Sequence, residues 1–185
     1  MRTGDISLHM IVKNEAELLP GLLEVVAPHV GQIIIVDTGS SDDTVAIATQ
    51  YTKRVFAFDM QKDFSAARNF ALSKASKPWV LQLDADEMPT KEMLQWLKDF
   101  TPESWVGGVQ FLRHNLIDGN PIGFHTNEWH IRLFQRHIRF VGVIHEKLPI
   151  HDAKTMKAPI DCIIQHYKTQ ERQERQNALY AEWVE

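Results

Sequence analysis

The chain has 185 residues, 44% of them apolar and 24% charged, proportions that are ordinary for a globular protein with its own core. Its formal net charge is −4 and its pI is about 6.1, so no basic excess indicates nucleic acid as a partner. No apolar run reaches the length of a membrane span, and we expect no secretory signal. The single cysteine, Cys162, lies in an apolar run and is expected to be a small core residue.

The first hundred residues alternate between strand and helix patterns. Short apolar runs predict strands at Ile6–Val12, Gln32–Val36, Arg54–Phe58 and Trp79–Leu83. Helical patterns begin at Asn14, follow the turn residues after Asp37, span Phe64–Ala75 and begin again at Thr90. Pro20 falls inside the first of them, so we expect it in the first turn or at a kink. This alternation predicts parallel strands with helices on both faces of one sheet.

The pattern changes after Phe100. Strands are predicted at Val106–Asn115, Glu128–Gln135, Arg139–Ile144 and Ala158–His166, which would extend the sheet in a mixed, largely antiparallel way. Thr169–Glu185 is charged and predicts a C-terminal helix. We therefore expect one α/β domain over residues 1–185, with a parallel half at 6–100, an antiparallel half at 101–168 and a final helix at 169–185.

Acidic residues gather where two of the predicted strands end. Asp37 ends the second strand, and Asp84, Asp86 and Glu87 follow the fourth. Ligands of open α/β sheets bind at the carboxyl ends of the strands, and carboxylates suit Mg²⁺ or Mn²⁺ together with phosphate oxygens. Two plainer interpretations stay open: Asp37 caps its own turn, and the later acids stabilise the helix that follows them.

Arg68 lies between these acids in the sequence, in a helix that opens with small residues. Such a helix can approach the sheet closely, and a guanidinium binds phosphate or ribose oxygens well. The alternative is a surface ion pair, which is the usual fate of a single arginine.

Several segments together resemble glycosyltransferase family 2. They are Met10–Glu15, Ile35–Asp42, Ala67–Asn69 and Leu83–Glu87, in this order and spacing. Three later segments are similar to a subgroup that includes lipopolysaccharide-core glucosyltransferases: Arg132–Phe134, Gly142–Leu148 and His166–Tyr167. The resemblance covers about residues 6–168.

The resemblance implies a GT-A fold, in which a Rossmann-like nucleotide-sugar half precedes an acceptor half. The implied reaction is inverting transfer of a sugar from a nucleoside-diphosphate sugar to an acceptor hydroxyl, in cell-envelope polysaccharide or lipopolysaccharide biosynthesis. The single cysteine fits a reducing, cytoplasmic setting. Peripheral association with the inner face of the membrane stays open, as does the oligomeric state.

The resemblance also implies roles for single residues in donor binding. The nucleoside would be held by Asp37 and the backbone around Val12, Lys13 and Asn14, and Arg68 would face the diphosphate. The chain departs from many relatives at the contact to the base, because they have paired aspartates where it has Asp37 and Thr38.

A divalent ion, Mn²⁺ or Mg²⁺, would bridge the diphosphate. Asp86 is its leading protein ligand, Asp84 lies near both the ribose and the ion, and His166 is an additional candidate ligand. A cation at this position stabilises the negative charge that develops on the leaving diphosphate.

Inversion requires a base that takes the proton of the acceptor hydroxyl. The candidates are Glu146 first, His145 second and Glu128 third. The alternative for Glu146 is an ion pair with Lys147 or Arg132 that only shapes its loop.

Two other functions stay open. Nucleotidyl transfer to a sugar phosphate uses a similar half-domain, but it needs a glycine-rich loop after the first strand, and Met10–Glu15 contains no glycine. The third hypothesis is a non-catalytic domain that binds sugar nucleotides or serves as a scaffold.

Overall fold

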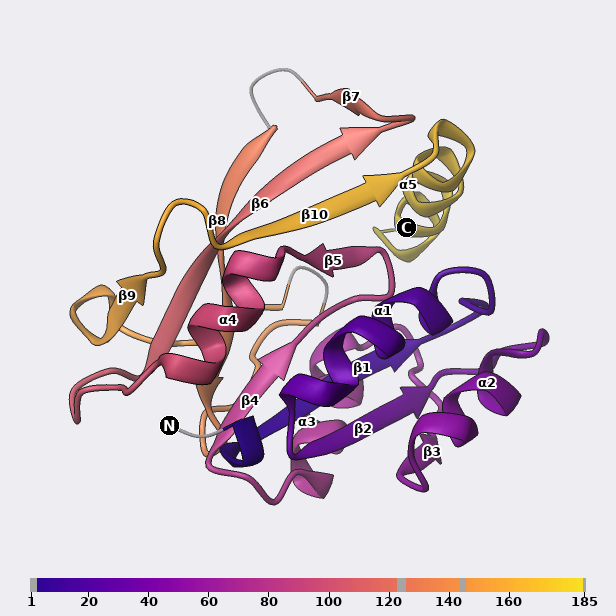
Figure 1. Ribbon diagram of the computed structural model, residues 1–185. Coiled ribbons are helices and arrows are strands. Elements are labelled where there is room, and N and C mark those ends of the chain that lie inside the picture. The colour runs from indigo at the N-terminus through magenta and orange to yellow at the C-terminus, as the bar shows by residue number, and fades with distance from the viewer. Residues whose placement is uncertain (1–2, 123–125, 144–145, 185) are drawn as a thin grey trace.

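The computed structural model describes residues 3–122, 126–143 and 146–184. In these residues the chain forms a single mixed sheet with helices packed on both of its faces (Figure 1). The sheet runs in the order β3-β2-β1-β4-β8-β6-β10-β5, and β7 and β9 pair with β6 outside this path.

The parallel half of the sheet has β1 at its centre. Its strands are β1 (Ile6–Val12), β2 (Gln32–Asp37), β3 (Val55–Ala57) and β4 (Trp79–Gln82). Each is parallel to its neighbour, so their carboxyl ends lie at one edge. Burial on both faces explains why these strands appear in the sequence as continuous apolar runs.

The second half joins the parallel half through β8 (Asn127–Gln135), which is antiparallel to both β4 and β6 (Gly108–Ile117). The remaining strands are β5 (Glu87–Pro89), β7 (Asn120–Pro121), β9 (Thr155–Lys157) and β10 (Ile163–Lys168). β10 is parallel to β6 and antiparallel to β5, so the expectation of a mixed sheet is confirmed.

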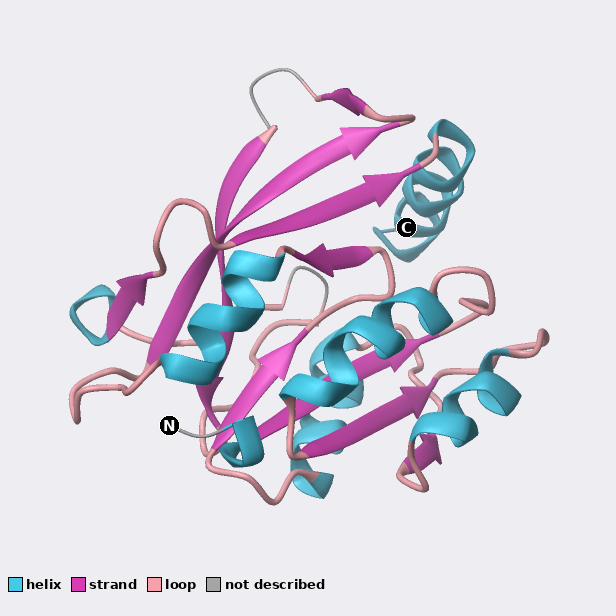
Figure 2. Ribbon diagram, viewed as in Figure 1, coloured by secondary structure: helices cyan, strands magenta, loops and turns pink. Residues whose placement is uncertain are grey.

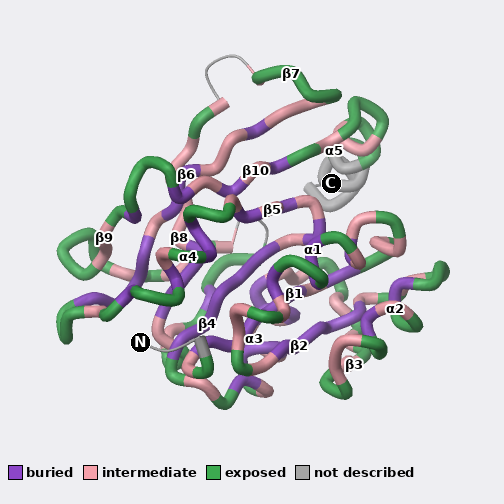
Figure 3. Tube along the Cα trace, viewed as in Figure 1, coloured by how far each residue is buried: buried purple, intermediate pink, exposed green. Residues whose placement is uncertain are grey.

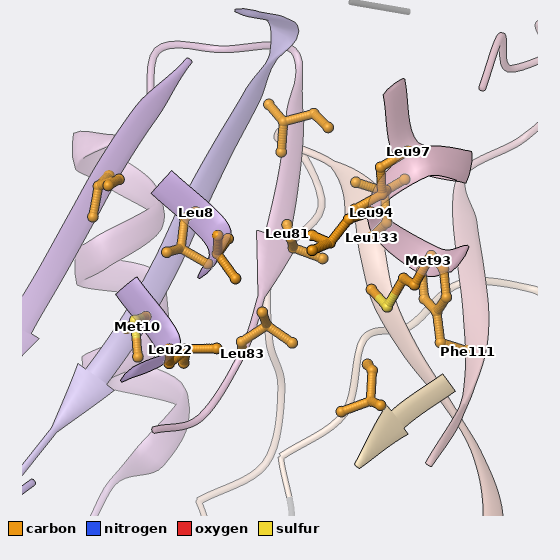
Figure 4. Packing of buried hydrophobic residues seen from close by; sticks show 14 of the residues in the cluster. Leu8, Met10, Leu22, Leu81, Leu83, Met93, Leu94, Leu97, Phe111 and Leu133 are labelled. Atoms are coloured by element: carbon orange, nitrogen blue, oxygen red, sulfur yellow. The ribbon is translucent and has the colours of Figure 1, made fainter. Parts of the chain in front are cut away.

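Helices cover the sheet on both faces (Figure 2). One face packs against α1 (Leu19–Val26), α2 (Thr44–Tyr51) and α4 (Lys91–Asp99), and the other against α3 (Phe64–Lys74). Alternate residues of β1 face opposite sides of the sheet. Leu8 and Met10 pack toward α1 (Figure 4). His9 points toward α3, where its Nε2 lies 3.1 Å from the carbonyl oxygen of Arg68.

The buried part of the chain follows the central strands (Figure 3). Cys162 is 2% exposed, as predicted, and burial raises the pKa of its thiol to about 11. No helix in the described part of the chain is long and apolar enough to cross a membrane. The last helix, α5 (Gln170–Val184), follows β10 and lies beyond its end (Figure 1).

Some predicted bounds are wrong, each for a local reason. The first helix begins at Leu19 rather than Asn14, because Asn14 adopts a left-handed backbone with φ of 56°. Pro20 lies in the first turn of α1 and not at a kink, which confirms one of the two predicted positions. The missed strands β5, β7 and β9 have only two or three residues each, too few to show a pattern.

Two predicted strands are also wrong. The described residues of Arg139–Ile144 form one bridge, Val141 to Lys147, because Gly142 turns the chain with φ of 93°. The strand expected at Ala158–His166 begins only at Ile163, after a turn in which the amide of Cys162 donates to the carbonyl of Pro159.

The packing of α1 gives a stability prediction. Leu22 is fully buried and Val25 on the same helix is 37% exposed. We expect Leu22→Ala to lower the free energy of unfolding by about 2–5 kcal/mol through the cavity it leaves, and Val25→Ala by less than about 0.5 kcal/mol. Denaturant unfolding measures both, and equal losses would contradict the assigned orientation of α1.

Candidate functional site

A cavity of about 570 Å³ lies at the edge where the parallel strands end. Its walls come from segments far apart in the sequence: the loops after β1, β2 and β4, helix α3, strands β6, β8 and β10, the first turn of α5, and Glu146. The volume is typical of a small-molecule site. The position agrees with the rule that open α/β sheets bind ligands at strand carboxyl ends.

Arg68 of α3 connects the predicted residues within this cavity. Its side chain is 7% exposed, and its Nη2 donates to Asp84 Oδ1 at 3.2 Å. Its Nε donates to Glu146 Oε1 at 2.5 Å. α3 can come this close because Asp63 caps its first turn and Ala67, beside the arginine, is fully buried. The surface-pair alternative for Arg68 is therefore wrong.

A second buried arginine, Arg132 of β8, lies beside the first. Its Nη2 donates to Glu87, whose side chain is fully buried, and lies 3.7 Å from Asp84 Oδ2. The amide oxygen of Gln82, in the orientation that satisfies its neighbours, accepts from the Nη1 atoms of Arg68 and Arg132, each at 2.9 Å. Positive and negative groups thus alternate beneath the cavity.

These charges change the protonation of Asp84. Burial by itself would raise the pKa of Asp84, but Arg68 and Arg132 outweigh it and hold that pKa well below its usual range. The carboxylate therefore stays ionised at any physiological pH. The amide of Asp84 also donates to Glu87 Oε2 at 3.2 Å, which fixes the loop after β4.

Asp86 and His166 form a pair that fits a divalent cation. His166 Nδ1 lies 2.8 Å from Asn115 Oδ1, and the amide nitrogen of Asn115 donates to Glu128 at 3.1 Å. This fixes the amide, so Nδ1 carries the hydrogen, and in the neutral ring Nε2 turns a lone pair toward Asp86 Oδ2, 3.4 Å away.

A carboxylate oxygen and an imidazole nitrogen at this distance from each other can share a metal ion when the nitrogen carries no proton. Carboxylate oxygen favours Mg²⁺ or Mn²⁺, and the imidazole favours the transition metal. No three His, Cys, Asp or Glu side chains in the described part of the chain converge on one metal position. The remaining ligands would have to be water or substrate oxygens, which is common for such ions.

Asp37 and Asn14 lie beside the cavity rather than on its walls. The Asp37 carboxylate accepts from the amides of Gly39 and Ser40, as the capping interpretation expects. Asn14 Oδ1 accepts from the amide of Ser41 at 2.8 Å, so the loops after β1 and β2 brace each other. Val12, Lys13 and Thr38 line the cavity next to this brace.

Of the candidate bases, Glu146 lines the cavity, and its partner is Arg68 rather than Lys147 or Arg132. His145 lies outside the described residues. Glu128 bonds to Arg113, Asn115 and His130 at the side of the cavity.

Sequence reasoning missed several charged residues of the cavity. Six cationic side chains and four carboxylates line it in the described residues, an excess of two positive charges in a chain of net charge −4. The cations are Lys13, Arg68, Arg113, Arg132, Lys168 and Arg172, and the acids are Glu15, Asp84, Asp86 and Glu146. Arg172 lies in a helix whose charges look solvent-facing in the sequence, so no local pattern distinguishes it.

Comparison with known proteins identifies the family. Residues 7–161 match the model of Glycosyl transferase family 2, which is most of the chain. The chain belongs to glycosyltransferase family 2. The expectation from the sequence motifs is confirmed at this level.

Curated relatives of this family 2 chain match over about half of its length. A TPR repeat-containing protein of Synechococcus elongatus is 51% identical over 84 residues, 45% of this chain and 21% of its own length. The lipopolysaccharide core biosynthesis glycosyltransferase LpsC of Rhizobium meliloti is 29% identical over 103 residues, 54% of this chain and 38% of its own. The matches thus span well under half of these relatives.

Solved structures show the same fold. TarS of S. aureus, residues 1–349 with UDP-GlcNAc, superposes with a TM-score of 0.62 at 16% identity, covering 91% of this chain and 59% of TarS. The mannosyltransferase PcManGT of Pyrobaculum calidifontis, with GDP-Man and Mn²⁺, gives 0.60 at 15% identity over 88% and 56%. The family 2 chain has the GT-A arrangement expected for it.

A buried histidine beneath the site gives a pH prediction. His9 Nε2 lies 3.1 Å from the carbonyl oxygen of Arg68, and its Nδ1 has no hydrogen-bond partner among the described residues. Burial, with help from the charge of Arg68, lowers the pKa of His9 from 6.5 to about 3. Below pH 6.5 His9 takes up a proton in the unfolded chain but not in the folded chain. The free energy of unfolding therefore falls as the pH falls from 6.5 toward 3.

We expect His9 to account for about 3 kcal/mol of the stability lost between pH 7 and pH 4. Between pH 7 and pH 4 the free energy of unfolding of His9→Gln should therefore fall by about 3 kcal/mol less than that of the wild type. His137→Gln changes an exposed histidine and should behave like the wild type. Denaturant unfolding at the two pH values tests this. Parallel declines in all three proteins would show that His9 is not the group responsible.

Proposed function

We propose that this chain transfers a sugar, with inversion, from a nucleoside-diphosphate sugar to an acceptor hydroxyl. The observation that supports this most is the cavity at the strand ends, where a positive excess lies around the buried pair Asp86 and His166. A sugar nucleotide carries a diphosphate that such a cavity can neutralise. TarS and PcManGT were solved with UDP-GlcNAc and with GDP-Man and Mn²⁺, which agrees with this donor class.

The nucleoside end of the donor would lie against Val12, Lys13 and Thr38, where two loops brace each other. Asp37 and Asn14 shape this wall through their bonds to neighbouring amides, and their direct contact with the nucleoside stays a prediction. Arg68 already bonds to the carboxylates of Asp84 and Glu146. It would therefore bind the diphosphate only through N–H groups that these two bonds leave unused.

Asp86 and His166 would hold the divalent ion, with Asp84 next to them. When bound, the ion supplies positive charge against the leaving diphosphate. The role of the chain is to orient the two ligands: the amide of Tyr167 donates to the carbonyl of Asp86 at 3.0 Å, which ties the loop after β4 to β10.

Glu146 is our proposed base because it lies between two cavities. A second cavity of about 350 Å³ shares Glu146, His130 and Arg132 with the first, and its other walls include Trp129 and Asp152. The acceptor would enter there, with its hydroxyl toward Glu146. Arg68 holds the carboxylate in a fixed orientation, which a base needs for a positioned proton transfer.

Assignment to cell-envelope or lipopolysaccharide biosynthesis rests on the similarity to LpsC. The glycosyltransferase SunS of Bacillus subtilis is also similar, with 34% identity over 92 residues, 49% of this chain and 22% of its own length. We propose the envelope assignment as the first to test, with a saccharide or lipid-linked acceptor.

A thermal-shift screen tests the donor class. One of the UDP-, GDP-, TDP- or ADP-sugars should raise the melting temperature with Mn²⁺ by several degrees, since ligand at 100 times its Kd adds about 2.7 kcal/mol. Asp86→Asn should lose the Mn²⁺-dependent part of the shift, and Asp99→Asn on the exposed side of α4 should keep it. A panel without any shift would argue against a donor site.

The base is tested by Glu146→Gln. Because the amide cannot accept a proton, we expect the transfer rate to fall by about 10²–10⁴-fold while the donor-induced thermal shift persists. Glu24→Gln, at an exposed position of α1 that lines neither cavity, serves as the matched control and should leave the rate unchanged. Normal turnover of Glu146→Gln would remove it as the base.

A further inference from the structure

Helix α5 places an arginine directly against the proposed cation ligands. Thr169 Oγ1 accepts from the amide of Arg172 at 3.2 Å, which fixes Arg172 in the first turn of the helix. The Arg172 guanidinium reaches into the cavity between two acids from different loops. Its Nη2 bonds to Glu15, after β1, and its Nε lies 3.6 Å from Asp86 Oδ2, after β4.

The oxygen next to Arg172 is the one that faces His166. Asp86 Oδ2 lies 3.4 Å from His166 Nε2 and 3.6 Å from Arg172 Nε. The same carboxylate oxygen therefore faces both the imidazole and the guanidinium. A divalent ion and a guanidinium that approach the same oxygen repel each other, so they compete for Asp86 Oδ2. The Asp86 side chain is only 8% exposed, so solvent does little to screen that repulsion.

Arg172 forms a hydrogen bond with only one of the two oxygens of Glu15. Glu15 Oε2 is buried and has no hydrogen-bond partner in the described part of the chain, although Oε1 is bonded to Arg172. Burial raises the pKa of Glu15 against the opposing effect of Arg172. Arg172 thus leaves one oxygen of the Glu15 carboxylate without a donor among the described residues.

We propose that Arg172 takes the place of the divalent cation at Asp86 while the donor site is empty, so that cation binding must displace Arg172. The guanidinium neutralises Asp86 and Glu15 in the meantime and holds α5 against the cavity. This inference rests on the proposed function, because it takes the ion to be held by Asp86 and His166. It makes the position of α5 depend on cation occupancy.

The test is a Mn²⁺ titration of the whole chain without nucleotide sugar, with free Mn²⁺ followed by electron paramagnetic resonance. Arg172→Gln should bind Mn²⁺ about tenfold more tightly than the wild type, because the competing charge is gone. Arg172→Lys keeps the charge and should stay within about twofold of the wild type. Arg175→Gln removes an equal charge from an exposed position of the same helix and should change affinity by less than about twofold.

Asp86→Asn separates the two proposals. If Asp86→Asn leaves Mn²⁺ binding unchanged, alone and combined with Arg172→Gln, the proposed cation site is wrong and this inference with it. If Asp86→Asn abolishes binding but Arg172→Gln binds Mn²⁺ no more tightly than the wild type, only the role of Arg172 is overturned.

A measurement on the wild type does not depend on how the variants fold. Displacement of Arg172 should loosen α5, so saturating Mn²⁺ should speed tryptic cleavage after Arg172 severalfold, as followed by fragment masses. Unchanged or slower cleavage would overturn the proposal.

Discussion

Two buried arginines hold the acids of this site in a fixed arrangement. Arg68 contacts Asp84 and Glu146, and Arg132 contacts Glu87 and lies near Asp84, so each of these charges has an opposite charge beside it. Removal of one member of such a group leaves a partner charged and buried, at a cost of about 3–5 kcal/mol. The same arrangement keeps the Asp84 carboxylate ionised.

This charged group also joins the two halves of the molecule. Arg68 comes from α3 in the parallel half, and Arg132 comes from β8, whose pairing with β4 connects the two halves of the sheet. The two cavities meet at Glu146 and Arg132, so under the proposed function a donor and an acceptor would approach the same carboxylate. A sugar transferase needs such a geometry, because the two reacting groups must meet in a defined orientation.

The sequence predicted the parallel half well and the second half less well. Fully buried strands such as β1 and β2 have short, continuous apolar runs that differ from their surroundings. Arg139–Ile144 looks equally apolar, but a glycine turn makes it a loop. The role of Asp37 could not be predicted from the sequence either. A carboxylate that caps its own turn and one that faces a ligand have the same sequence pattern.

The sequence by itself determined the order of the central elements, the family, and the acids at the strand ends, because these depend on local patterns. Only the tertiary structure decided which charges meet. Glu146 lies 78 positions from Arg68, and Arg172 lies 157 positions from Glu15, yet each pair is in contact. Pairing of β10 with β5 and β6 brings the end of the chain to the acids after β4, and such non-local contacts leave no periodic signal in the residues that make them.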